Sequence, residues 1–200
     1  MKEITEYVLN QLKENDVDYC EVRGDEIKNN SFVLKNSNPE LASSSTTKGI
    51  GARYTINGSL GFLSINDFEK EKIKEIIKKS IRLTKTCGKN SEFGDGEINK
   101  ANYKVKEKIK IEDLEPSIVL KILKELDNGI KDIAGRFFSL DANLEKKYLL
   151  NTEGSKIYSE IPRVGIMYLL TLIKEEKSLQ RYAYHGGTGG WEIVNGFKLN

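Results

Sequence analysis

Apolar residues recur at helical spacing in three parts of the chain. The first helix is predicted over residues 2–15 and the second over about 67–86. The third begins near Asp113, with Pro116 in its first turn. The inward faces carry, in chain order, Ile4, Tyr7, Val8 and Leu12; Ile73, Ile76, Ile77 and Ile81; and Val119, Ile122, Leu123, Leu126, Ile130 and Ile133.

Between these helices the pattern changes to the alternation of polar and apolar residues that is typical of strands. One strand is predicted from residue 19, followed by a turn near 28–30 and a second strand around 32–35. Residues 46–67 supply two more. After the third helix four further strands are expected, at 136–142, 145–151, 155–171 and 175–185. The predicted fold class is α+β, with two helix-plus-antiparallel-sheet units.

The chain divides into two halves that share the order of a helix followed by four strands. Residues 1–86 hold a helix, four strands and a helix, and residues 113–187 hold a helix and four strands. Residues 87–112, charged and without an apolar period, are predicted to be an irregular connection. Residues 188–200 are expected to be a truncated linker. An internal duplication and chance similarity between strand-rich segments both explain the shared order, and we expect one compact N-terminal domain.

The stretch TTKGIGARYTINGSLGFLSIND, residues 46–67, places four glycines among strand-forming residues. It contains no GxxxxGKS/T, GxGxxG or GxSxG motif, so neither a phosphate loop nor a nucleophile elbow is expected. Asn57 and Gly58 instead predict a type I′ turn between two antiparallel strands. This turn sets the register, which pairs Ile56 with Ser59, Thr55 with Leu60, Tyr54 with Gly61 and Arg53 with Phe62.

The register predicts what each face of the hairpin does. The Tyr54 ring would lie across Gly61, and Arg53 would rest its guanidinium against the aromatic ring that faces it. Gly49 and Gly51 indicate a bulge or a close approach by another backbone. The core face is expected to carry Ile50, Ala52, Tyr54, Ile56, Leu63 and Ile65.

Composition narrows the class of protein. The chain has 200 residues, with 32 Lys and Arg against 30 Asp and Glu and a formal net charge of +2. These charges alternate in sign along the chain, so nucleic-acid binding is not expected. Only two cysteines occur, Cys20 and Cys87, which favours a reducing cytoplasm. The charged start is not a signal peptide, and no apolar run approaches the ~20 residues that cross a bilayer, so we expect a cytoplasmic protein without membrane contact.

Several stretches, in this order, resemble the N-terminal region of the TldD/PmbA family, once called modulators of DNA gyrase. They are DYCEVRGDE after an opening helix, GIGARYTINGSLGF before an Asn and a helix, NTEGSKIYSEIPRVGIMYLL, and a glycine-rich RYAYHGGTGGWEIV. The resemblance implies a zinc-dependent peptidase that cleaves unfolded peptides and works as an assembly of two related subunits. It also implies that an HExxxH helix and a later Cys hold the metal, all beyond Asn200.

No metal ligand or catalytic residue is therefore predicted in this chain. A catalytic zinc site generally needs three protein ligands, and the chain has one histidine, His185. Zinc is implied only for the full-length family member. Arg23, Arg53 and His185 are candidate contacts for substrate or partner. The alternatives are arginine stems over the sheet with their heads in water, and a hydrogen-bonded surface histidine.

Two further expectations concern the second half. The strand at 155–171 is long enough to accept a peptide by edge addition. Trp191 would be an anchor whose partner lies outside the chain, at the end of a mobile linker.

The predicted function is the N-terminal domain of a TldD/PmbA-type metallopeptidase, forming the substrate chamber and the subunit interface without the metal site. Such a chain would be inactive alone. The alternative is a non-catalytic assembly or peptide-binding subunit. Expected partners are a related TldD/PmbA-family subunit, in a homo- or hetero-oligomer, and a peptide substrate.

Overall fold

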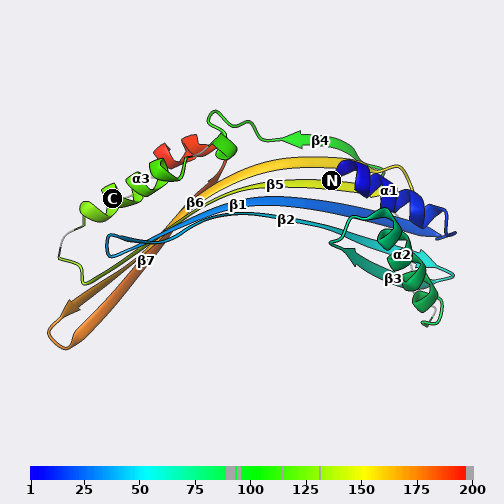
Figure 1. Ribbon diagram of the computed structural model, residues 1–200, viewed down its shortest axis with the longest axis horizontal. Helices are drawn as coiled ribbons and strands as arrows, with labels where there is room; N and C mark the ends of the chain where they lie inside the picture. The colour runs from blue at the N-terminus through cyan, green and yellow to red at the C-terminus, as the bar shows by residue number, and fades with distance from the viewer. Residues whose placement is uncertain (89–92, 94–95, 114, 131, 197–200) are drawn as a thin grey trace. The chain divides into compact units, whose positions relative to one another are not determined.

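The computed structural model describes residues 1–88, 93, 96–113, 115–130 and 132–196 (Figure 1). Its helices are α1 (Lys2–Lys13), α2 (Lys70–Thr84) and α3 (Pro116–Asn128), with 3₁₀ helices η1 (Ile111–Asp113) and η2 (Trp191–Gly196). Its strands are β1 (Tyr19–Lys35), β2 (Asn38–Ile56), β3 (Ser59–Ile65), β4 (Lys100–Lys104), β5 (Gly135–Asn151), β6 (Lys156–Lys174) and β7 (Lys177–Thr188). Within these residues the seven strands form one sheet in the order β3-β2-β1-β5-β6-β4, with β7 also paired to β6. The predicted α+β class is confirmed.

The chain divides into two compact units, and each contains parts of this sheet. Unit 1 comprises Met1–Ile27, Thr47–Lys104 and Glu145–Glu160, and unit 2 comprises Lys28–Thr46, Val105–Leu144 and Ile161–Asn200. The long strands β1, β2, β5 and β6 each contribute residues to both units. An internal duplication is not shown, and the domain boundaries drawn from the sequence stay predictions.

In unit 1, α1 and α2 pack on one face of the strands. The buried residues of α1 and α2 recur at helical spacing, and those of β3 at every second position, as burial of one face requires. The core comprises Val8, Leu9, Leu12, Cys20, Val22, Ile50, Ala52, Tyr54, Ile56, Leu63, Ile65, Ile73, Ile77, Ile81 and Leu150. The second helix begins at Lys70 instead of near residue 67. Before it, the Asp67 carboxylate accepts a hydrogen bond from the Glu69 N–H at 3.2 Å, which holds the preceding residues in a turn.

The predicted hairpin is confirmed together with its register. Asn57 and Gly58 have φ values of 51° and 72°, as a type I′ turn requires. The predicted pairs all occur, from Ile56 with Ser59 to Arg53 with Phe62. A Cβ on Gly61 would overlap the Tyr54 ring, so the ring does lie across the glycine.

The bulge expected near the two earlier glycines is wrong for Gly51. Pairing continues without a break through Gly51 and Ser64. The Phe62 ring lies over this glycine, 3.8 Å from where a Cβ would be. At Gly49 a Cβ would sit 3.8 Å from the Ile65 carbonyl oxygen, an ordinary contact. Gly51 therefore lies in regular pairing between β2 and β3, whereas the bulge or close approach expected at Gly49 stays a prediction.

Two strands are longer than the pattern predicts. β1 continues through residues 28–30, where a turn is expected, and β5 continues through 143–144, where two strands are expected. Leu144 is 1% exposed and extends the buried alternation of β5, so nothing interrupts the strand there. The first turn after β1 instead uses Asn36 and Ser37, whose φ values are 47° and 68°.

In unit 2, α3 packs on one face of β5 and β6. Pro116 occupies the first turn, as predicted, although the helix begins there and not near Asp113, which lies in η1. The unit 2 core comprises Phe32, Leu34, Ile111, Val119, Leu123, Phe138, Leu140, Ala142, Val164, Ile166, Trp191 and Val194.

The segment predicted as an irregular connection contains an ordered strand. β4 pairs in parallel with β6, from Lys100 with Lys156 to Lys104 with Glu160. All five residues of β4 are exposed, so it carries no apolar alternation. The expected partner of Trp191 outside the chain is also wrong. The Trp191 side chain belongs to the unit 2 core, and the residue is 6% exposed. The backbone N–H of Trp191 donates to the Ile109 carbonyl at 2.8 Å.

Candidate functional site

One face of the unit 2 sheet carries apolar side chains, and α3 packs on the opposite face. Strand pairing places Met167 opposite Tyr184 and Leu169 opposite Tyr182 on this face. Together with Phe137 of β5, these residues are called the aromatic strip. Phe137, Met167, Leu169 and Tyr182 line a shallow hollow of about 370 Å³.

The two tyrosines of the strip are unusually exposed. Tyr182 is 76% exposed and Tyr184 is 68% exposed. The Tyr184 ring lies over two facing glycines, Gly165 and Gly186, because a Cβ on either would overlap it. The strip ends at a polar pair, where the Gln180 amide donates to the Thr171 hydroxyl at 3.3 Å. An apolar patch with a polar border is typical of an interaction surface.

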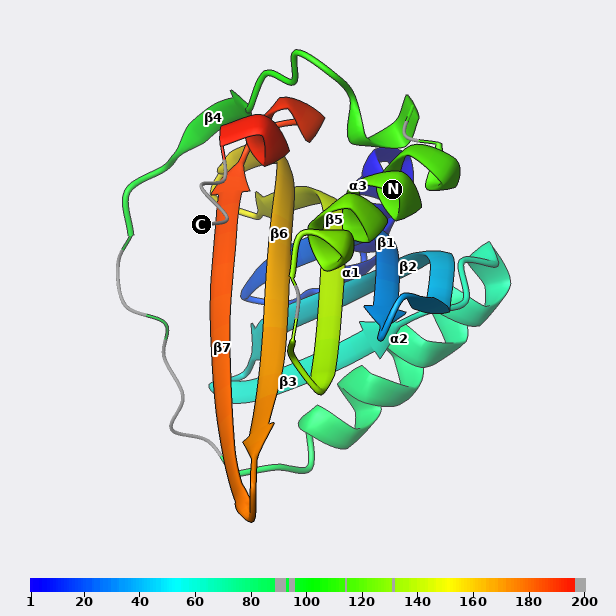
Figure 2. The same ribbon diagram turned by 90° about the vertical axis from the view of Figure 1, so that its left-hand side faces the viewer.

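The strip lies beside an open strand edge. β7 is the outer neighbour of β6 in unit 2 (Figure 2), and within the described residues no strand pairs with its other edge. An edge strand presents unpaired N–H and C=O groups to an added strand. The expectation that 155–171 accepts a peptide is wrong, because β6 is already paired with β5 on one side and with β4 and β7 on the other. Among the described residues of unit 2, residues 38–46 of β2 also lack a partner on the β3 side, but the open edge beside the strip is β7.

His185 lies on β7 but on the face opposite the strip. It pairs with the buried Ile166, and its ring stacks on Tyr168 with centroids 6.3 Å apart. The imidazole is partly buried beside the unit 2 core. A contact from His185 to a substrate or partner stays a prediction.

The two candidate arginines lie in unit 1, each in an ion pair. Arg53 bonds to Glu21 through Nη2 at 2.6 Å, and Arg23 bonds to Asp25 through Nε at 2.9 Å. The aromatic partner expected for Arg53 is wrong. Its guanidinium carbon lies 5.2 Å from the centre of the Phe93 ring, instead of resting on Phe62. Both arginine side chains are more than half exposed, so these pairs contribute at most about 1 kcal/mol, and their role in binding stays a prediction.

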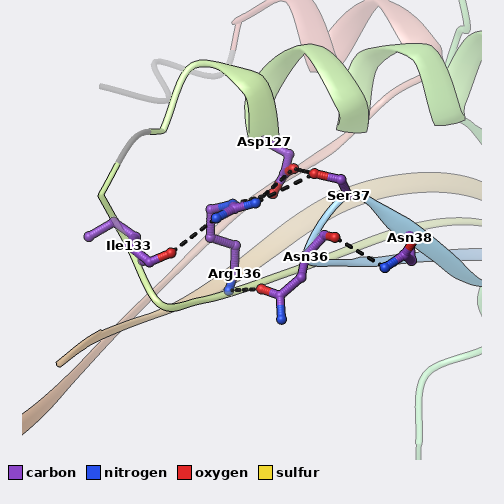
Figure 3. A network of polar contacts seen from close by, with 6 residues as sticks. All are labelled: Asn36, Ser37, Asn38, Asp127, Ile133 and Arg136. Atoms are coloured by element: carbon purple, nitrogen blue, oxygen red, sulfur yellow. Dashed lines mark hydrogen bonds and ion pairs between the residues drawn. The ribbon is translucent and has the colours of Figure 1, made fainter.

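A polar network fixes α3 to the strands of unit 2 (Figure 3). Arg136 of β5 donates from Nε to Asp127 of α3 at 2.7 Å, and the Ser37 hydroxyl donates to the same carboxylate. The Arg136 N–H donates to the Asn36 side chain at 2.8 Å, and its guanidinium donates to the Ile133 carbonyl at 3.0 Å. The network therefore joins α3, the turn after β1 and the start of β5.

The hydrogen bonds of this network favour the ionised form of Asp127. Burial alone would raise the pKa of Asp127, but hydrogen bonds from Arg136 and Ser37 outweigh it and hold the pKa below its ordinary value. The Asp127 side chain is 1% exposed. A buried carboxylate needs such partners, so the network holds α3 against the strands of unit 2.

The residues present do not fit a catalytic zinc site. An HExxxH motif needs two histidines, and the chain has one. Among the described residues no three His, Cys, Asp or Glu side chains gather as metal ligands would. Cys20 is buried, and burial raises its pKa to about 11, which disfavours the thiolate that binds metal.

In the described part of the chain no helix is long and apolar enough to cross a membrane.

Several solved proteins share this fold. A candidate modulator of DNA gyrase from Bacteroides thetaiotaomicron superposes with a TM-score of 0.78 at 15% identity, over 92% of this chain and 44% of that chain. TldE from Thermococcus kodakarensis superposes with a TM-score of 0.71 at 17% identity, over 92% and 42%. A further candidate modulator of DNA gyrase, from Thermotoga maritima, has a TM-score of 0.71 at 15% identity, over 100% and 44%.

Sequence comparison gives the family. Residues 20–84 match the family model described as PmbA/TldA metallopeptidase domain 1, and residues 100–199 match the PmbA/TldA metallopeptidase central domain. The curated protein Metalloprotease MJ0996 of Methanocaldococcus jannaschii is 29% identical over 192 residues, 92% of this chain and 42% of that protein. This chain belongs to the TldD/PmbA metallopeptidase family. It spans less than half the length of the relatives it matches.

The aromatic strip is not among the residues selected from the sequence. The signal that could have revealed it is the run VGIMYLL at 164–170, which is apolar at nearly every position. A strand with two apolar faces buries one in the core and leaves the other for a second partner. In the structure Val164 and Ile166 enter the core, and Met167 and Leu169 belong to the strip.

Proposed function

We propose that this chain forms part of the substrate chamber and of the subunit interface in a TldD/PmbA-type metallopeptidase that acts on unfolded peptides. In this proposal it supplies peptide-binding surface, and zinc is bound by other parts of the assembly. The matches to domain 1 and to the central domain support this assignment. A related family subunit is the proposed partner, in the cytoplasm.

The aromatic strip beside the open β7 edge is the observation that supports peptide binding. An extended peptide has free backbone groups at every residue, and it can add to β7 as a further antiparallel or parallel strand. Its alternate side chains would then point toward the strip face. Tyr182 and Tyr184, which lie on β7 itself, would contact apolar side chains of the peptide, whatever its sequence. Such binding suits unfolded chains, because folded proteins already pair their backbone groups.

A binding experiment tests this assignment. A short unstructured peptide with alternating apolar residues, amidated at its C-terminus and labelled with fluorescein, is titrated with the chain, and anisotropy is recorded. Tyr182→Ser is expected to raise Kd by about tenfold, because it removes an exposed aromatic contact. Tyr103→Ser is the matched control, since Tyr103 is also exposed, at 58%, but lies on β4 in unit 1. Equal Kd values for Tyr182→Ser and the wild type would contradict the proposal.

The catalytic part of the proposal has its own measurement. The purified chain with added zinc is expected not to hydrolyse an unfolded peptide above background. Stoichiometric zinc accompanied by hydrolysis would overturn the assignment of the metal to other parts of the assembly.

A non-catalytic peptide-binding subunit is the second candidate, and the same strip supports it. Mixing the chain with a family subunit that carries HExxxH discriminates the two. Faster hydrolysis on mixing favours the chamber role, whereas peptide binding without any change in hydrolysis favours the second candidate.

A further inference from the structure

Unit 1 contains a groove that lies outside the strip and outside both arginine pairs. Its volume is about 600 Å³, and its walls come from α1, β4, β5 and β6. The residues that define this lysine groove are Lys2, Lys100, Lys156, Tyr148, Tyr158 and Leu150.

The charged residues that line the lysine groove are all positive. Three lysines line it, and no lining residue is acidic. Among the described residues, Lys156 bonds to Glu6 at 3.1 Å, and Lys2 and Lys100 have no carboxylate partner. The Lys156–Glu6 pair is more than one-third exposed on both sides, so a ligand can compete for this lysine.

The carboxylate next to the groove is already engaged. Glu160 accepts hydrogen bonds from Tyr158 at 2.5 Å and from Lys104 at 3.1 Å. Burial alone would raise the pKa of Glu160, but these two bonds hold it below its ordinary value. Burial and the Glu160 contact also raise the pKa of Tyr158, so its hydroxyl keeps the proton it donates. Glu160 is therefore already bonded to Tyr158 and Lys104, and it does not line the groove.

The floor of the groove is apolar. Leu150 is 7% exposed, and the rings of Tyr148 and Tyr158 lie with centroids 4.7 Å apart. Paired rings offer a flat surface for an aromatic or branched side chain. A purely inorganic anion would leave this surface uncovered, so the lining favours a ligand with both a charge and an apolar body.

We propose that the lysine groove binds a carboxylate carried on an apolar stem, the chemistry found at the C-terminal end of a peptide. The lysine ammonium groups bind the carboxylate oxygens, and the last side chain packs on Leu150 and the tyrosine pair. Charge-assisted hydrogen bonds of this kind are roughly twice as strong as neutral ones. This inference does not rest on peptidase activity.

The test compares one tripeptide in two forms. N-acetyl-Ala-Leu-Phe with a free carboxylate and the same peptide as its C-terminal amide are titrated into the whole chain by calorimetry. The acid is expected to bind about tenfold more tightly than the amide. Lys100→Gln combined with Lys156→Gln should remove this preference. Lys79→Gln, an exposed change on α2, should preserve it.

Three outcomes would overturn the inference. They are equal affinity for acid and amide, an acid preference that survives in the double variant, and displacement of the acid by inorganic phosphate at equal concentration. Circular dichroism establishes that the variants are folded. Tyr182→Ser should leave the acid preference unchanged, so failure here and failure of the proposed strip function can be told apart.

Discussion

Both units place a tyrosine ring over a glycine of the facing strand, yet the two rings have different surroundings. In unit 1, Tyr54 lies over Gly61 and is 0% exposed, with its hydroxyl 2.6 Å from Ser80 and 2.9 Å from Thr84 of α2. In unit 2, Tyr184 lies over Gly165 and is 68% exposed. The same cross-strand arrangement is therefore part of the core where a helix covers it and is exposed where none does.

Removing the two rings should give the largest difference. Tyr54→Ala is expected to lower the free energy of unfolding by about 4 kcal/mol, because it leaves a cavity and unpaired hydroxyls under α2. Tyr184→Ala should change it by less than about 0.5 kcal/mol, as exposed positions usually do. Urea denaturation measures both. Similar losses for the two variants would show that a partner or segment covers Tyr184 as α2 covers Tyr54.

The ion pairs give a second comparison, in which the buried member is in unit 2 and the exposed member is in unit 1. Asp127→Ala should lower the free energy of unfolding by about 3 kcal/mol, because Arg136 loses its buried partner. Glu21→Ala, at the exposed Arg53 pair, should cost less than about 1 kcal/mol. Urea denaturation at pH 7 tests the ranking, and an equal cost would contradict the burial argument.

The Asp127 pair also predicts a pH dependence. The pKa of Asp127 is depressed in the folded state, so its stabilisation is complete above the unfolded pKa of about 3.9. That stabilisation is lost as the pH falls below about 4, through the folded pKa. The stability difference between the wild type and Asp127→Asn should therefore shrink on acidification. A difference that stays constant from pH 6 to the acid limit of folding would contradict the assignment.

Replacing Gly61 or Gly165 by alanine should give the smallest changes in the free energy of unfolding. Gly61→Ala should cost about 2 kcal/mol, because the Tyr54 ring is enclosed and cannot move aside. Gly165→Ala should cost about 1 kcal/mol or less, since the exposed Tyr184 side chain can rotate away. Thermal unfolding compares them directly. A larger cost at Gly165 would mean that Tyr184 is held in place.

Local chemistry made part of this structure predictable. Asn57 and Gly58 specify a turn type, so the register of β2 and β3 followed from two residues. Pro116 marked the first turn of α3 in the same way. Features that depend on distant residues were not predictable. Phe93, and not Phe62, lies beside Arg53, and a contact with a residue so remote in sequence leaves no local pattern.

The remaining differences have equally physical causes. β4 has five exposed residues, so its pairing with β6 rests on backbone hydrogen bonds that leave no apolar pattern. The turn predicted at residues 28–30 came from polar side chains that a partly exposed strand also accepts. The aromatic strip was hidden because periodicity indicates burial but does not indicate which apolar face lacks a cover.

The central claim is that an extended peptide adds to the open edge of β7, beside the aromatic strip. Hydrogen exchange along β7 tests this claim most directly. With the amidated peptide bound, exchange should slow at alternate residues between 177 and 185, whose N–H groups point outward, and should stay unchanged on β3. Unchanged exchange on β7 at saturating peptide, or equal protection on β3, would contradict the account.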